Sequence, residues 1–249
     1  MIIDCHTHWG ANYADRDGDS PTKWLETPDR YGVDKFILLG HYNLVRSDLC
    51  QEDNDRLCRV AGQAPGRFIP FGSAWPQMGA AAVEEARRCI QDLGMRGLKF
   101  HPWIQGFYTG ERVFGEICAL AGDLGVPVLF HDGTPCYSLP EQYAGLARRF
   151  PKTTFVLGHS GILWSWRSAL EASRQPNIWL CLCGPHQRAI EEICRRADPD
   201  RLLWGTDYGF GFADSVGYRL NIFLQAQVPD GLKEKVLGDN ALRLVGLQA

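Results

Sequence analysis

The sequence has no long apolar run, no CxxC pair of cysteines and no cluster of basic residues; the closest cysteines are Cys181 and Cys183. None of its hydrophobic segments approaches the ~20 residues that a membrane-spanning helix requires. Its 9 cysteines include no CxxC pair, whereas structural zinc sites usually take two paired ligand motifs. Lysine and arginine do not accumulate in one block, and the formal net charge is −3. We therefore expect neither a membrane nor a nucleic acid as a partner.

Two further signals are missing near the amino terminus. The first residues, MIIDCHTH, resemble a strand and lack the charged and apolar regions of a signal peptide. Together with the unpaired cysteines, this indicates a cytoplasmic protein whose thiols stay reduced. The segment CHTHWG after that strand lacks the GxGxxG pattern, which argues against a dinucleotide-binding fold.

The size and composition of the chain fit one globular domain. It has 249 residues, of which 45% are hydrophobic and 22% are charged. Such a chain buries a large core, and α/β barrels of about 250 residues fold as one unit. We therefore expect a single domain over residues 1–249.

Short apolar runs recur along the whole chain, and each ends in polar or glycine residues. These runs cover residues 1–8, 35–40, 67–74, 97–101, 127–133, 154–161, 178–184 and 201–208. Near-continuous apolar runs of this length are typical of parallel strands that are buried on both faces.

Helical patterns lie between the apolar runs. The clearest cover residues 80–93, 111–124, 142–150, 186–197 and 239–247. Alternating strands and helices predict an α/β fold with a parallel sheet. Eight such units in about 250 residues favour a single (β/α)8 TIM barrel over an open sheet. The polar, glycine-rich segment 10–28 is expected to be a long loop at the mouth of this barrel.

Histidines gather where the predicted strands end. Five of the 7 histidines do so, and an aspartate ends the eighth strand; the residues are His6, His8, His101, His131, His159 and Asp207. The carboxyl ends of barrel strands meet at one mouth, where catalysis takes place. Imidazole and carboxylate are natural ligands of Zn²⁺, Mn²⁺ and Fe²⁺. The pattern predicts one divalent metal at the mouth, with Zn²⁺ expected first.

The order of these residues resembles a known family. HTH, GLKFHP, LFHDG, VLGHSG and WGTD follow one another, and the chain closes with LGDNALRLVGL. This series is similar to the amidohydrolase-related family, a branch of the amidohydrolase superfamily that contains hydrolases, lactonases and some decarboxylases. The resemblance covers nearly the whole chain and implies a metal-dependent TIM barrel.

The resemblance also implies roles for individual residues. His6, His8, His131 and Asp207 match the metal ligands, and Asp207 also matches the base that takes a proton from the attacking water. His159 matches an acid/base or oxyanion-binding helper, and we place His101 at the substrate. The main expectation is hydrolysis of an amide, ester or lactone in a small molecule, with water activated by the metal.

Several alternatives stay open at this point. The first is non-oxidative decarboxylation of a small aromatic or enoic acid; decarboxylases of this family often carry Glu where this chain has His6, which favours hydrolysis. The second is a binuclear hydrolase in which Lys99 is carboxylated, whereas the simpler expectation pairs Lys99 with Asp4 inside the barrel. The third is a metal-binding protein without turnover. A homo-oligomer is compatible with each.

Overall fold

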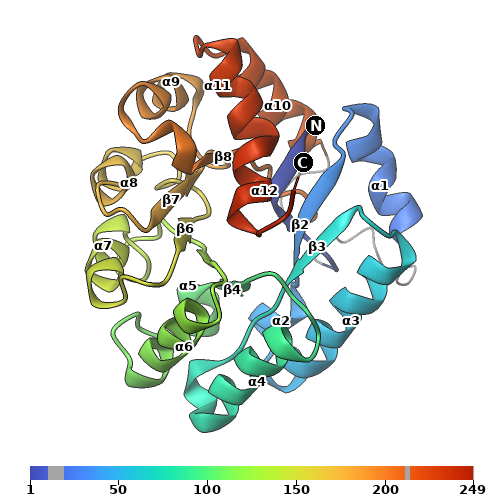
Figure 1. Ribbon diagram of the computed structural model, residues 1–249, viewed down its shortest axis with the longest axis vertical. Helices are drawn as coiled ribbons and strands as arrows, with labels where there is room; N and C mark the ends of the chain where they lie inside the picture. Colours follow the sequence, from blue (N-terminus) through green and yellow to red (C-terminus); the bar gives the residue numbers. More distant parts are fainter. Residues whose placement is uncertain (11–19, 211–213, 249) are drawn as a thin grey trace.

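Short strands form a ring at the centre of the molecule, and helices surround it (Figure 1). The computed structural model describes residues 1–10, 20–210 and 214–248. The strands are β1 (Ile3–His8), β2 (Lys35–Leu39), β3 (Phe68–Phe71), β4 (Leu98–Phe100), β5 (Val128–Phe130), β6 (Phe155–Leu157), β7 (Ile178–Cys181) and β8 (Leu202–Leu203). Each lies within one of the eight apolar runs, so their positions are confirmed.

Two parallel sheets, β1-β2-β3 and β4-β5-β6-β7-β8, join into a closed barrel. At one junction a parallel bridge links Gly72 to Leu98, and the amide of Lys99 donates to the carbonyl oxygen of Gly72 at 2.7 Å. At the other junction the amide of Cys5 donates to the carbonyl oxygen of Trp204 at 3.0 Å. The chain is therefore the expected (β/α)8 barrel.

Alternate residues of each strand enter two different apolar layers. In β2, Phe36 and Leu38 join the cluster that packs against the surrounding helices. Ile37 and Leu39 join a smaller inner cluster that also contains residues of α12 (Asn240–Leu244). Because α12 packs on the inner cluster, it closes the amino-terminal end of the barrel and leaves the opposite end as the mouth.

The helices on the outside follow the expected alternation. They are α1 (Pro21–Arg30), α2 (Tyr42–Val45), α3 (Cys50–Gln63), α4 (Ala80–Gln91), α5 (Pro102–Gln105), α6 (Arg112–Asp123), α7 (Pro140–Arg149), α8 (Trp166–Ala172), α9 (Gln187–Arg196), α10 (Ser215–Gln225) and α11 (Asp230–Glu234). In the part of the chain that the structure describes, no helix has the length and apolar character needed to cross a bilayer.

The expectation of a loop over residues 10–28 is wrong for its second half. Residues 11–19 lie outside the described residues, but Pro21–Arg30 form helix α1. Proline at the first helical turn is favourable, and Trp24, Leu25 and Pro28 bury one face of the helix. The polar residues between them are the exposed side of an amphipathic helix, which composition alone does not distinguish from a loop.

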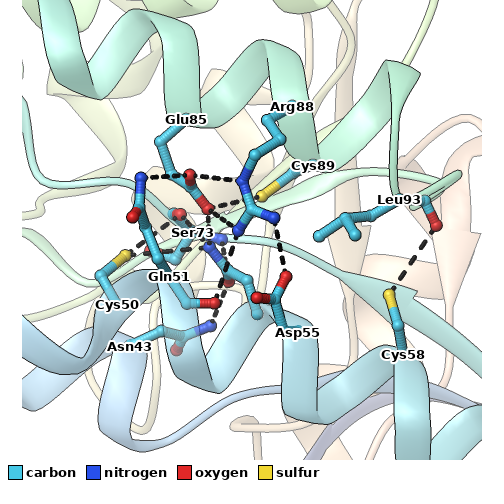
Figure 2. Close-up of polar contacts among 11 residues, drawn as sticks. Asn43, Cys50, Gln51, Asp55, Cys58, Ser73, Glu85, Arg88, Cys89 and Leu93 are labelled. Carbon is cyan, nitrogen blue, oxygen red and sulfur yellow. Dashed lines mark hydrogen bonds and ion pairs between the residues drawn. The ribbon is translucent and has the colours of Figure 1, made fainter.

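A buried polar network ties the mouth end of β3 to α3 and α4 (Figure 2). Asn54 of α3 accepts a hydrogen bond from the amide of Ser73 at 3.1 Å and donates to the carboxylate of Glu85 at 2.7 Å. Arg88 also binds Glu85, at 2.8 Å. The side chain of Gln105 donates to the hydroxyl of Ser73 at 3.3 Å and accepts from the amide of His101 at 2.8 Å. The network therefore reaches from the outer helices to the strand end that carries His101.

Candidate metal centre at the barrel mouth

Three of the expected ligands meet at one point of the mouth. His6, His8 and Asp207 offer ligand atoms that all lie within 4.8 Å of one another. The Nε2 atoms of His6 and His8 are 3.5 Å and 3.4 Å from the same carboxylate oxygen of Asp207. The two histidines come from β1 and the aspartate from the segment after β8, two neighbouring parts of the closed barrel.

Backbone carbonyl groups orient both imidazole rings. Nδ1 of His6 donates to the carbonyl oxygen of Gly158 at 3.0 Å, and Nδ1 of His8 donates to that of Gly40 at 2.9 Å. A carbonyl oxygen only accepts, so Nδ1 carries the proton in each ring and Nε2 keeps its lone pair. Gly158 must be glycine, because a Cβ would lie 2.3 Å from the carbonyl oxygen of Phe130.

A bulge in β1 changes which of its side chains face the interior. Asp4 pairs with Phe36 of the outer layer, whereas His8 pairs with Leu39 of the inner layer, and the register shifts between Asp4 and Thr7. One extra residue therefore breaks the simple alternation that placed Asp4 on the same face as His6 and His8.

The expected pairing of Lys99 with Asp4 is wrong as a consequence. The carboxylate of Asp4 accepts hydrogen bonds from the hydroxyl of Thr206 at 2.5 Å and from the amide of His6 at 3.1 Å. Nζ of Lys99 instead lies 3.0 Å from Nε2 of His6. Burial lowers the pKa of Lys99 to about 8, although the negative charge of Asp207 opposes this shift.

Asp207 has an unusual backbone conformation. Its φ is 60°, in the left-handed region that few residues other than glycine adopt, and its amide donates to the carbonyl oxygen of His6 at 2.8 Å. Gly209 follows at a φ of 87°, where a Cβ would lie 1.9 Å from the carbonyl oxygen of His8. Burial raises the pKa of the Asp207 carboxyl to about 6, against the opposing charges of Lys99 and Arg219.

The other expected histidines lie beside this point rather than in the same set. His131 is not one of the three, because its Nε2 lies 2.8 Å from the hydroxyl of Thr134. Its ring stacks on that of His101, with centroids 3.8 Å apart and planes at 9°. The ring of His159 approaches both His131, at 4.7 Å, and His6, at 4.6 Å. The four rings form one continuous cluster.

Burial keeps these imidazoles neutral. It lowers the pKa of His131 to about 3 and that of His6, His8 and His159 well below the ordinary value, and neighbouring positive charges such as Lys99 add to the effect. Neutral imidazole is the form that binds metal. The donor set of His6, His8 and Asp207 therefore fits a divalent cation in chemistry, protonation and spacing.

Other residues lie near the mouth although the sequence pattern did not identify them as site residues. The ring of Phe210 lies 5.0 Å from that of His8, and Arg219 of α10 donates to the carbonyl oxygen of Pro185 at 3.1 Å while its charge reaches Asp207. Asp132 accepts from the amide of His159 at 2.6 Å. Asp132 follows His131 in the sequence, so its place at a strand end is the one signal that could have found it.

Known proteins are similar to this chain in sequence and in fold. The sequence model of the amidohydrolase family matches residues 3–247. The 2-amino-3-carboxymuconate-6-semialdehyde decarboxylase of Dictyostelium discoideum is 24% identical over 241 residues, which span 80% of this chain and 67% of that protein.

Solved structures share the fold at low sequence identity. The 5-carboxyvanillate decarboxylase of Sphingomonas paucimobilis superimposes with a TM-score of 0.80 at 18% identity, over 100% of this chain and 99% of the other. A dihydroxybenzoic acid decarboxylase of Polaromonas sp. JS666, whose structure contains manganese, has a TM-score of 0.73 at 18% identity, over 100% and 98%. With the family match over nearly its whole length, the chain belongs to the amidohydrolase family.

Proposed function

We propose that this protein is a metal-dependent enzyme that removes carbon dioxide from a small aromatic or enoic carboxylic acid without oxidation. Two observations support the proposal together. His6, His8 and Asp207 form a set suited to one divalent cation, and the curated relative that spans 80% of the chain is a decarboxylase. The similarity thus favours decarboxylation over the hydrolysis that the sequence alone suggests first.

In this proposal His6, His8 and Asp207 hold the metal. His131 would join them as a further ligand by exchanging the contact of its Nε2 with the hydroxyl of Thr134 for the metal. The metal, when bound, supplies positive charge that attracts and orients the carboxylate of the substrate. Lys99 adds a second positive charge near the same place, since its Nζ lies 3.0 Å from Nε2 of His6.

Asp207 is the residue that we assign to proton transfer. Burial raises the pKa of the metal-free carboxyl to about 6. With one carboxylate oxygen on the metal, the second oxygen would carry the proton and act as a general acid. Its proton goes to the substrate carbon that bears the carboxylate. The bond from that carbon to the carboxylate then breaks, carbon dioxide leaves, and the electron pair stays with the substrate. Asp207 regains a proton from water.

The remaining residues of the mouth would position the substrate. His159 lies beside His6 and is assigned to support the negative charge that develops. His101 faces the substrate together with the ring of Trp103, whose centroid is 6.1 Å away and whose side chain is exposed. Phe210 closes the opposite side next to His8. Flat aromatic walls suit a planar unsaturated acid.

Hydrolysis of an amide, ester or lactone is the second candidate, and His6 favours it because many decarboxylases of this family carry Glu there. In that reaction Asp207 would act as base and His159 as helper. A hydrolase with two metals would need Lys99 to be carboxylated. The pKa of about 8 of the free Lys99 amine leaves a fraction of it neutral, and the neutral amine is the form that reacts with carbon dioxide.

One experiment separates the two main reactions. The metal-loaded protein is given hydroxylated or aminated aromatic and enoic acids, and in parallel a panel of esters, lactones and amides. We expect release of carbon dioxide from an acid and, in heavy water, one deuterium at the carbon that carried the carboxylate. The variant Asp207→Asn should lose this activity, and Cys136→Ser, at an exposed thiol, should keep it. Turnover of an ester or lactone alone would refute the proposal in favour of hydrolysis.

A further inference from the structure

The mouth contains a second group of three potential ligands, of which Cys183 has no role in the proposed reaction. His6, His159 and Cys183 are all buried, and their ligand atoms lie within 4.8 Å of one another. His6 is the only member that this group shares with the set of His6, His8 and Asp207. The second group offers two nitrogens and a sulfur, whereas the first offers two nitrogens and an oxygen.

Neighbouring strands bring His159 and Cys183 together. β6 and β7 are paired in parallel, with Leu157 opposite Leu180 (Figure 1), and His159 and Cys183 follow these paired residues at the mouth. The backbone between them is tightly packed, because a Cβ on Gly184 would lie 2.5 Å from the carbonyl oxygen of His159. Asp132 fixes the backbone of His159 through its amide at 2.6 Å. The position of the pair is therefore built into the fold.

The two groups differ in the cations that they suit. Thiolate ligands select soft cations such as Cd²⁺ or Zn²⁺, whereas a carboxylate suits Mn²⁺. Ligand atoms on one tetrahedral zinc lie roughly 3.4–3.6 Å apart, given the usual bond lengths to nitrogen and sulfur. A group within 4.8 Å needs only small side-chain rotations to reach that spacing.

The two groups cannot be filled at the same time. Nδ1 of His6 donates to the carbonyl oxygen of Gly158, so only Nε2 can bind a cation, and it must give up its contact with Nζ of Lys99 to do so. One lone pair binds one cation. We propose that His6, His159 and Cys183 form a second, soft-cation position that competes with the His6–His8–Asp207 position for His6. Binding there releases the thiol proton of Cys183 to the solvent, and it takes His6 away from the carboxylate set. The proposal concerns cation choice and does not depend on which reaction the enzyme catalyses.

Cd²⁺ and Mn²⁺ are the probes for the test. The parent protein carries Cys136→Ser, because Cys136 is the exposed cysteine and would bind Cd²⁺ at the surface. Metal-free parent is titrated with Cd²⁺ while the sulfur-to-cadmium charge-transfer absorption is followed. The same titration is made with Cys183→Ser and with Cys181→Ser, a matched change of a buried thiol two residues away.

We expect the absorption in the parent and in Cys181→Ser, and its loss in Cys183→Ser. Persistence in Cys183→Ser, or absence from the parent, would overturn the proposal. A second measurement does not rely on the folding of a variant at either buried cysteine. Parent loaded with Mn²⁺ is titrated with Cd²⁺, and free Mn²⁺ is read by electron paramagnetic resonance. One Mn²⁺ released for each Cd²⁺ bound supports competition for His6, whereas binding of Cd²⁺ with all Mn²⁺ retained contradicts it.

Discussion

The raised pKa of Asp207 predicts how metal affinity depends on pH. A proton on the carboxyl competes with the metal, so affinity falls as pH drops through the pKa of about 6. At pH 5 roughly ten carboxyls are protonated for each one that is ionised, and at pH 7 the ratio is reversed. The affinity for Mn²⁺ should therefore be about tenfold lower at pH 5 than at pH 7, or about 1.4 kcal/mol.

The histidines should contribute little to this change. Burial lowers the pKa of His6 and His8 well below the ordinary value, so both are already neutral between pH 5 and 7. Two ordinary imidazoles would instead add a further loss of several hundredfold over the same interval. The size of the change in Mn²⁺ affinity between pH 5 and 7 therefore indicates how many protons Mn²⁺ displaces on binding.

Isothermal titration calorimetry with Mn²⁺ at pH 5, 6 and 7 measures this dependence. Asp207→Asn should bind Mn²⁺ more weakly at every pH but should show almost no change between pH 5 and 7, since an amide does not titrate there. A tenfold change that persists in Asp207→Asn would refute the assignment to this carboxyl. A loss of more than roughly a hundredfold in the wild type would mean that the histidines titrate as well.

Three further predictions follow from the packing. Asn54→Ala leaves the amide of Ser73 without its partner and should lower the free energy of unfolding by about 3 kcal/mol in urea. In the control Gly62→Ala, where a Cβ meets open space, the free energy of unfolding should stay equal or rise slightly. If Asn54→Ala and Gly62→Ala had the same effect, the role of the network would be contradicted. Gly209→Ala forces a Cβ to within 1.9 Å of the carbonyl oxygen of His8, so calorimetry should find Mn²⁺ binding strongly reduced while circular dichroism still shows a folded barrel. Of the 9 cysteines, Cys136 is exposed, Cys58 is half-buried and seven are buried, so a thiol reagent should label Cys136 first. Rapid labelling of any of the seven buried thiols in Cys136→Ser, located by mass spectrometry, would contradict their burial.

The sequence by itself determined the barrel and the order of its polar strand ends. Apolar runs such as residues 35–40 and 178–184 are long enough for a strand but too short for a buried helix, and their regular spacing leaves few topologies. Strand direction then places His6, His8 and Asp207 at the same end, because all strands of such a barrel run in parallel. The family follows from the same residues and is confirmed by the match over residues 3–247.

Only the tertiary structure decided which of the polar residues at the strand ends contact one another. The bulge in β1 cannot be read from alternation, and it turns Asp4 toward Thr206 while Lys99 approaches His6. The hydrogen bond between His131 and Thr134 depends on a side-chain rotation that no spacing encodes. The approach of Cys183 to His159 depends on how two loops pack across Gly184. Strand direction fixes the end of the barrel to which a side chain belongs, whereas bulges, rotamers and loop packing fix its neighbours.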